Sequence, residues 1–170
     1  MKNFTGFLLI GIILTLISFL VVGVFSDGNM ILNSKIRIEQ KSQHQVIDQL
    51  SDLERIPNWL FIFQEEGVNY AIDESEESIS WTQKKDGPEM TLFLKPKSDQ
   101  VTYLITAKQG GDTKLIYSIL QDGSDLELAC DYEIEIPLIY RFFSKSIKEK
   151  LEEKLDLNMV ELKTFLESKN

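Results

Sequence analysis

The stretch VTYLITAKQGGDTKLIYSILQDGSDLELACDYEIEIP, residues 101–137, contains three segments in which apolar and polar residues alternate. This alternation predicts strands with one buried face, because successive side chains of a strand point to opposite sides of a sheet. The separators Gly110-Gly111-Asp112 and Asp122-Gly123-Ser124 are typical of hairpin turns. We therefore expect three consecutive antiparallel strands, the last of which ends at Pro137.

The chain before this stretch repeats the pattern. Alternating segments near residues 68–73, 78–83 and 90–96 are separated by runs of Asp, Glu, Ser, Gly and Pro. A further segment at residues 32–39 alternates in the same way. Together these segments predict seven strands in one strongly curved antiparallel sheet.

Two helices are expected around the strands. Ser42 followed three residues later by Gln45 is a capping box, which predicts a short helix that Pro57 ends, followed by an aromatic turn around Trp59. The second helix, over residues 142–168, is long and amphipathic. Its apolar positions recur every three or four residues, at Ile147, Leu151, Leu155, Met159, Leu162 and Leu166.

Before these elements lies a segment that predicts a membrane anchor. Phe4 to Phe25 is 22 residues long without a charge, enough for a helix to cross a hydrocarbon core of about 30 Å. The alternative is a signal peptide, but its apolar region is about 7 to 15 residues long and ends in a small-residue cleavage site. Residues 24–28 contain no such site, so we expect a retained single-pass transmembrane helix.

The orientation of the anchor across the membrane is predicted from the few charges that flank it. Lys2 precedes the span, while Lys35, Arg37 and Lys41 follow it, so a simple count of positive charges is nearly balanced. The positive charge nearest the span is at the amino terminus, and Asp27 is the first charge after the span. We expect the amino terminus inside and the soluble domain extracytoplasmic.

The charge of the chain argues against nucleic-acid binding. The formal net charge is −9, and Lys2 is the only charge in residues 1–25, so the remainder carries −10. A nucleic-acid-binding domain presents a basic patch, whereas acidic residues interrupt the Lys clusters here. We predict no nucleic-acid partner, and no protein partner follows from the sequence.

The residues that carry most chemistry are scarce. His44 and Cys130 are the only histidine and cysteine, too few for a zinc site of nitrogen and sulfur ligands. His44 lies on the helix face opposite Val46 and Leu50, and Cys130 lies in the buried row of the last strand. We predict no catalytic residue, no metal and no cofactor, which leaves an enzyme unsupported rather than excluded.

The order of these elements resembles the START-like, helix-grip superfamily, and within it bacterial membrane-anchored members of the polyketide cyclase/dehydrase and lipid-transport (SRPBCC) group. The likeness covers about residues 33–168. It includes the closing segment at 136–143, the ending at 162–167 and a short motif formed by Val46, Leu50, Asp52, Leu53 and Trp59. We therefore expect an α+β helix-grip fold of order β-α-α-β6-α, with an anchor and joint at 1–28 and a START-like soluble domain at 29–170.

That resemblance implies a cavity for an apolar ligand between the curved sheet and the long helix. Three tyrosines on the inward face fit such a cavity, because a buried phenol needs a hydrogen-bond partner. Acidic residues before Trp81 and Cys130 in the last strand depart from the usual pattern, so the pocket is expected to be reshaped. The expected ligand-binding residues are Trp81, Leu92, Tyr103, Tyr117, Leu128, Cys130, Tyr132, Leu151 and Leu155.

Three functions stay open at this point. The first is a membrane-tethered domain that binds an apolar or lipid-like small molecule. The second is a non-catalytic structural or interaction protein of the cell envelope with a filled core. The third is a cyclase or dehydratase-like enzyme, which would need an acid-base pair facing the cavity.

Overall fold

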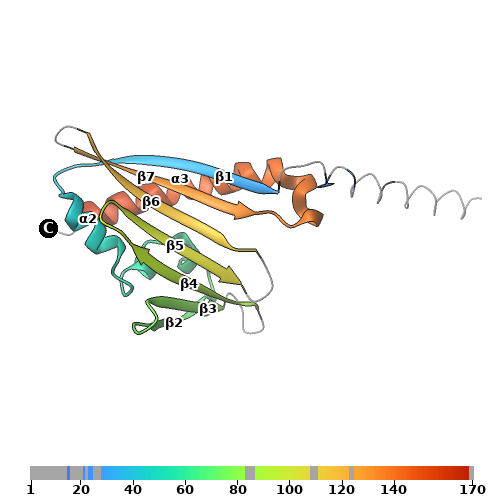
Figure 1. Cartoon of the computed structure of the whole chain (residues 1–170), viewed down its shortest axis with the longest axis horizontal. Coiled ribbons are helices and arrows are strands. Elements are labelled where there is room, and N and C mark those ends of the chain that lie inside the picture. Colours follow the sequence, from blue (N-terminus) through green and yellow to red (C-terminus); the bar gives the residue numbers. More distant parts are fainter. Residues whose placement is uncertain are drawn as a thin grey trace, which may run out of the picture.

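The structure is a computed structural model that describes residues 28–82, 87–107, 111–122 and 125–168, with residues 15, 21, 23 and 24 before them (Figure 1). In chain order the elements are β1 (Asn29–Ile38), α2 (Gln43–Leu50), η1 (Ile56–Asn58), η2 (Phe61–Phe63), β2 (Asn69–Asp73), β3 (Ser78–Thr82), β4 (Glu89–Pro96), β5 (Gln100–Ala107), β6 (Thr113–Asp122), β7 (Asp125–Glu135), η3 (Leu138–Phe143) and α3 (Ser144–Ser168).

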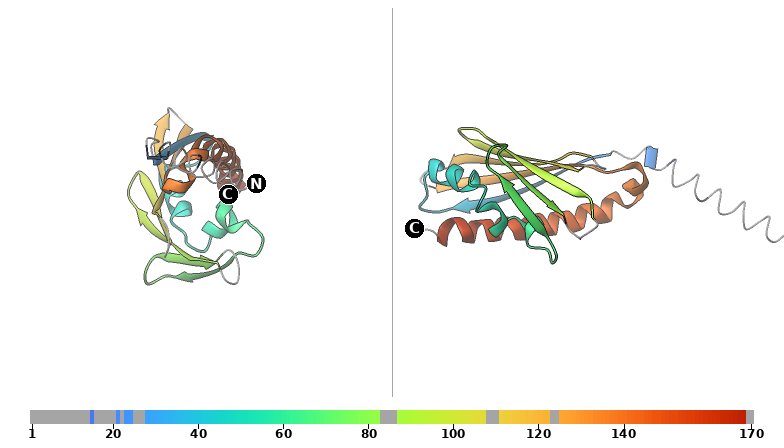
Figure 2. Two further views of the ribbon diagram at one scale, coloured as in Figure 1. Left: turned by 90° about the vertical axis from the view of Figure 1, so that its right-hand side faces the viewer. Right: turned by 90° about the horizontal axis from the view of Figure 1, so that it is seen from below.

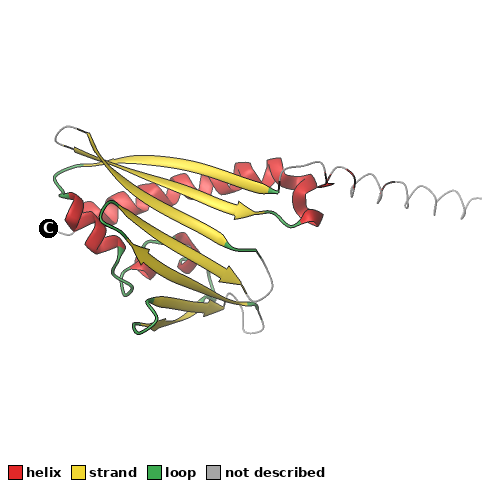
Figure 3. Cartoon of the chain, viewed as in Figure 1, coloured by secondary structure: helices red, strands yellow, loops and turns green. Residues whose placement is uncertain are grey.

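The strands form one seven-stranded antiparallel sheet in the order β1-β7-β6-β5-β4-β3-β2 (Figure 3). Strands β2 to β7 follow one another as a meander, and β1 closes the other side by pairing with β7. Because neighbours are antiparallel, β1, β4 and β6 begin at the edge where β3, β5 and β7 end. We call this edge the Asn29 end of the sheet. The curved, seven-stranded α+β arrangement expected from the alternation is confirmed.

The inward face of the sheet is the one that the alternation predicted. Inward residues of β3 to β7 are buried, with Met90 partly buried, and α3 buries Leu155, Met159, Leu162 and Leu166 against them. Figure 2 shows the sheet curving around α3 and around the segment between β1 and β2, with α3 running along β1. The helix-grip architecture is thus present.

Two helical expectations need correction. The second helix of the expected β-α-α-β6-α order is instead the pair of 3-10 turns η1 and η2, because Pro57 donates no backbone hydrogen bond and Leu60 is extended, with ψ of 118°. The long helix begins at Ser144 rather than at Phe142, after the separate 3-10 segment η3. The capping box of Ser42 and Gln45 is confirmed on α2.

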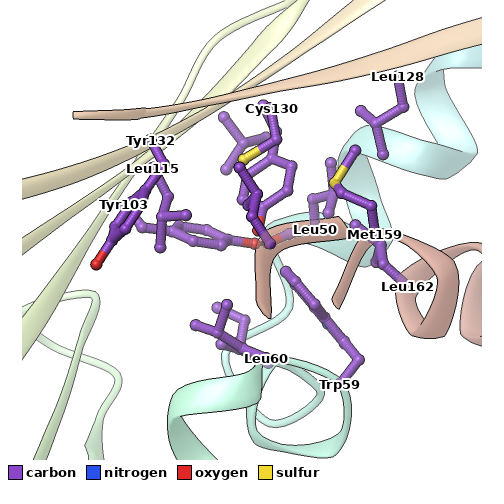
Figure 4. Close-up of a cluster of buried hydrophobic side chains, with 14 of the residues drawn as sticks. Leu50, Trp59, Leu60, Tyr103, Leu115, Leu128, Cys130, Tyr132, Met159 and Leu162 are labelled. Carbon is purple, nitrogen blue, oxygen red and sulfur yellow. Dashed lines mark hydrogen bonds between the residues drawn. The ribbon is translucent and has the colours of Figure 1, made fainter. Parts of the chain in front are cut away.

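Trp59 occupies the middle of the core. Its ring lies 5.7 Å from the ring of Tyr117 and 6.1 Å from that of Tyr103, centroid to centroid, and it is 1% exposed. The buried amide of Asn158 on α3 donates to the carbonyl of Trp59. Figure 4 shows Trp59 projecting from the segment that carries Leu60 toward the side chains of the sheet. This segment fills the centre of the space between sheet and α3.

The expected anchor, Phe4 to Phe25, lies almost wholly outside the described residues, as only 15, 21, 23 and 24 belong to both. Within the described part of the chain, no helix is both long and apolar enough to cross a bilayer. The anchor and the division into 1–28 and 29–170 stay predictions.

Two core tyrosines allow a matched test of the packing. The Tyr103 hydroxyl donates to the carbonyl of Leu50 at 2.6 Å, whereas the equally buried Tyr117 hydroxyl has no oxygen or nitrogen partner among the described residues and lies beside the Cys130 thiol, a weak partner. Tyr103→Phe should therefore lower the free energy of unfolding by about 1–2 kcal/mol, and Tyr117→Phe should leave it within about 0.5 kcal/mol or raise it. Urea unfolding followed by circular dichroism measures both. Equal losses in the two variants would contradict this assignment.

Candidate functional site

A cleft of about 200 Å³ opens between the sheet and the η2 turn. The sheet side comes from strand positions close to the Asn29 end, and the other side comes from η2 and the loop after it. Its lining residues are Ile62, Glu65, Trp81, Met90, Ile105, Thr113 and Tyr132. The cleft is therefore mainly apolar and lies at the end of the sheet where the chain enters the domain.

Two aromatic residues give the cleft its polar character. Trp81 is 2% exposed, and its indole nitrogen has no hydrogen-bond partner among the described residues. Phe63 packs against the indole ring of Trp81 in an edge-to-face arrangement, with the two ring centroids 5.2 Å apart. Burial raises the pKa of Tyr132 to about 12, with a smaller contribution from Cys130, so its phenol stays neutral at physiological pH. Both side chains carry hydrogen-bond donors next to an apolar wall.

One ion pair crosses the region of the cleft. Lys154 of α3 donates to Glu65 at 2.9 Å, and both side chains are partly exposed. An exposed pair of this kind contributes about 0–1 kcal/mol, so its main effect is to hold the loop after η2 near α3. Glu65 is the only acidic side chain in the lining.

The predicted ligand-binding residues fall into three groups. Trp81 and Tyr132 line the cleft. Leu151 is partly buried on α3 and packs against the core. The other six are buried in the core: Leu92, Tyr103, Tyr117, Leu128, Cys130 and Leu155. Contact of any of the nine with a ligand stays a prediction.

Sequence reasoning missed several lining residues. Met90 and Ile105 belong to the inward row of alternating residues, and their position near strand ends was the available signal. Ile62 and Glu65 lie in an aperiodic segment, where no alternation indicates which side chain faces the sheet. Their placement depends on how the η1–η2 segment packs around Trp59.

The single cysteine and the single histidine differ in solvent exposure. Cys130 is fully buried, and burial raises the pKa of its thiol to about 12. His44 is highly exposed on α2, where its Nδ1 lies 2.9 Å from a carboxylate oxygen of Asp48. They therefore form no nucleophile-base pair. Within the described ranges, no three His, Cys, Asp or Glu side chains gather closely enough to hold a metal ion.

Larger hollows lie elsewhere on the surface. One of about 640 Å³ is lined by Asp73, Ser80 and neighbours at the β2 edge, and one of about 580 Å³ by His44, Ile47 and Ser98 beside α2. A third, of about 290 Å³, involves Lys114 and Glu133, whose charged groups lie 3.5 Å apart. Each of these hollows is lined by two or more Asp, Glu, Lys or His side chains, whereas Glu65 is the one such residue in the lining of the cleft at Trp81, so the cleft is the better candidate for an apolar ligand.

Comparison with solved structures identifies the fold. Similar structures include a protein of unknown function from Staphylococcus aureus (TM-score 0.60, 11% identity, 82% of this chain and 96% of that chain). They also include a START superfamily protein from Mycobacterium smegmatis (0.58, 15%, 82% and 99%) and the Aha1 dimer from Colwellia psychrerythraea (0.57, 10%, 81% and 96%). The fold of this chain is START-like. No family model and no curated protein sequence matches it.

In this START-like domain the centre of the grip is closed. Trp59, Tyr103 and Tyr117 pack on one another between sheet and α3, and Met159 and Leu162 of α3 are fully buried with them. The open space is thereby confined to the Asn29 end, beside Trp81 and Tyr132. The reshaped pocket stays a prediction.

The burial of Cys130 predicts an unreactive thiol. A thiolate is the nucleophile in disulfide exchange, and burial both suppresses the thiolate and blocks the reagent. Ellman's reagent at pH 8 should therefore release no thionitrobenzoate from the folded chain and one equivalent from the chain in guanidinium. Rapid stoichiometric labelling of the folded chain would show that the thiol is accessible.

The buried phenols and thiol also predict loss of stability at alkaline pH. Burial raises the pKa of Cys130 and Tyr132 to about 12 and the pKa values of Tyr103 and Tyr117 well above 10. The unfolded chain loses these protons from about pH 8.5 for Cys and about pH 10 for Tyr, so it binds fewer protons than the folded chain there. The free energy of unfolding should be unaffected by these groups below pH 8 and fall above about pH 9.

Urea unfolding at a series of pH values measures this dependence. Each group that ionises only in the unfolded chain lowers the free energy of unfolding by about 1.4 kcal/mol per pH unit. Cys130→Ala should remove the part of the decline that begins at the lowest pH. A free energy of unfolding that stays constant to pH 11 would contradict the burial of all four groups.

Proposed function

We propose that this chain is a membrane-tethered domain that binds an apolar or lipid-like small molecule in the cleft lined by Trp81 and Tyr132. The observation that carries the proposal is the mainly apolar cleft itself, whose lining includes Trp81 and Tyr132. The indole nitrogen of Trp81 is buried without a partner among the described residues, and a shift of the cleft wall would be needed to bring it to a ligand acceptor. An apolar molecule with one polar group matches such a wall.

The size of the cleft limits the ligand. Pockets that enclose drug-sized ligands measure about 300–1,000 Å³, and the cleft measures about 200 Å³. The cleft suits a small apolar molecule, or one end of a longer one whose remainder extends through the open side. This favours partial enclosure of a chain-like ligand over complete enclosure.

The place of the cleft supports the tethered part of the proposal. It lies at the Asn29 end, and the uncharged residues Phe4 to Phe25 precede Asn29 by only a few positions. A domain held there reaches molecules that reside in a membrane. The single-pass anchor with an extracytoplasmic domain rests on the length and charges of the sequence.

A cleft-filling substitution tests the proposal. Ile62→Trp places a larger side chain in the lining, and Phe61→Trp is the matched control, because Phe61 is a partly buried neighbour on η2 outside the lining. With a fluorescent fatty acid as the probe, Ile62→Trp should weaken binding to the full chain in detergent by about tenfold or more, which is about 1.4 kcal/mol. Phe61→Trp should bind as the unaltered chain does.

Two results would overturn the proposal. One is the absence of probe binding by the unaltered chain together with no bound species in native mass spectrometry. The other is equal weakening by Ile62→Trp and Phe61→Trp, which would place the probe outside the cleft. Circular dichroism of both variants checks that they fold.

A second candidate is a non-catalytic interaction protein of the cell envelope. The filled centre of the grip around Trp59 favours it, because a closed core has no room for a centrally enclosed ligand. The surface of α3 offers an exposed pair, Lys148 and Glu152, at 3.6 Å. Crosslinking that recovers one stoichiometric partner, lost in the double variant Lys148→Glu with Glu152→Lys, would favour this candidate over ligand binding.

A further inference from the structure

The η3 segment presents a row of exposed apolar side chains. Leu138 is 40% exposed, and the other four range from 47% to 68% exposed. We call these five residues the η3 patch: Leu138, Ile139, Tyr140, Phe142 and Phe143. Apolar side chains of this size are usually exposed singly, and a contiguous group of them marks a surface that another phase or molecule covers.

The backbone holds the η3 patch in this outward orientation. Pro137 precedes the segment in an extended conformation, and its carbonyl accepts from the backbone nitrogen of Tyr140 at 2.8 Å. The one charged residue of the segment, Arg141, is only partly exposed and donates through Nε to the carbonyl of Ile136 at 3.0 Å. The usual arrangement of a surface segment is therefore reversed, with the charge held against the domain and the apolar groups outside.

The η3 patch borders the entry of the chain into the domain. The backbone nitrogen of Ile136 donates to the carbonyl of Gly28 at 2.7 Å. A side chain at Gly28 would collide with the guanidinium of Arg141, and a methyl at Gly23 would lie 3.0 Å from the carbonyl oxygen of Leu138. Figure 1 shows η3, in orange, and the start of β1, in blue, at the same end of the domain. The uncharged residues Phe4 to Phe25 thus join the domain beside this patch.

The chain from Ile136 to Lys148 is basic, between Glu135 on one side and Glu149 on the other. Residues 136–148 contain Arg141, Lys145 and Lys148 and no Asp or Glu, in a domain whose net charge is −10 without residues 1–25. Aromatic and aliphatic side chains next to Lys and Arg are typical of segments that lie in the headgroup region of a bilayer with anionic lipid. The composition of the patch and its location agree.

We propose that the η3 patch docks the domain onto the lipid bilayer, with its apolar side chains in the headgroup region and the exposed Lys145 facing anionic lipid phosphates. The inference rests on the tethered part of the proposed function and adds the orientation of the domain. Because the cleft lies at the same end of the sheet, this contact directs the cleft toward the membrane surface. A ligand that leaves the bilayer then has a short path to Trp81.

Tryptophan quenching by brominated lipid tests the contact directly. Ile139→Trp reports on the η3 patch, and Val160→Trp is the matched control, because Ile139 is 68% and Val160 is 59% exposed. Val160 lies on α3, about 24 Å along the helix from Ser144. The native Trp59 and Trp81 are 1% and 2% exposed, so they contribute little quenchable emission.

The full chain is reconstituted into vesicles of phosphatidylglycerol and phosphatidylcholine, with bromine on the phosphatidylcholine acyl chains. We expect most of the emission added by Ile139→Trp to be quenched and the emission added by Val160→Trp to be unaffected. Flotation of the vesicles measures in the same samples whether the chain is retained by the bilayer. Binding of the fluorescent fatty acid in detergent should be unchanged in both variants, because neither residue lines the cleft.

The possible outcomes distinguish three hypotheses: docking of the η3 patch, the membrane tether and ligand binding in the cleft. If the chain floats with the vesicles but the emission of Ile139→Trp is quenched no more than that of Val160→Trp, the docking is overturned and the tether is retained. Chain that does not float overturns both. Emission at position 139 that changes with protein concentration without lipid assigns the patch to a second copy of the chain, which also overturns the docking. Loss of fatty-acid binding in the unaltered chain bears on the cleft alone.

Discussion

The packing of Trp59 between the sheet and the long helix is the contact on which the rest of the domain depends. Its ring meets Tyr103 and Tyr117 of neighbouring strands, and its carbonyl accepts from the buried amide of Asn158 on α3. One residue therefore joins the sheet, the η1–η2 segment and the helix. A seven-stranded sheet curved this strongly has a wide concave face, and a large aromatic side chain fills more of it than any aliphatic one.

This central packing decides where a ligand has room. With Trp59 in the middle, the space between sheet and α3 is closed near Cys130, and the open cleft lies between the sheet and η2, beside Trp81 and Tyr132. Buried polar groups without an oxygen or nitrogen partner among the described residues occur in both parts, because the Tyr117 hydroxyl and the Trp59 indole nitrogen lie in the closed centre. The Tyr103 hydroxyl is satisfied by the carbonyl of Leu50, whereas the indole nitrogen of Trp81 lacks a partner among the described residues.

The two ends of the domain differ in character. At the far end α3 finishes near Leu166 and Glu167, away from the start of β1 (Figure 1). At the Asn29 end lie the cleft, the η3 patch and the junction with the uncharged amino-terminal residues. The cleft lining and the patch come from segments far apart in sequence, and the sheet brings them to one end because alternate strands begin and end there.

The sequence by itself determined the sheet, its inward face and the buried stripe of α3. Those features follow from period-2 and period-3.6 patterns, which are local and which one buried face enforces. Alternation also predicted that Trp81 and Tyr132 face inward. It predicted the same for Tyr103 and Cys130, which are buried in the closed core rather than beside the cleft. The length and lack of charge of Phe4 to Phe25 belong to the sequence as well.

Only the tertiary structure decided which buried residues border open space and which apolar residues remain outside. Whether an inward side chain meets a cleft or a neighbour depends on what packs opposite it, and for this sheet that is the aperiodic segment carrying Trp59 and Ile62. The same reason applies to Asn158, a polar residue that α3 buries because the Trp59 carbonyl lies opposite. It applies again to Leu138 and Phe143, whose exposure follows from the turn that Pro137 and Arg141 hold in place. Contacts between segments far apart in the chain leave no periodic signal along it.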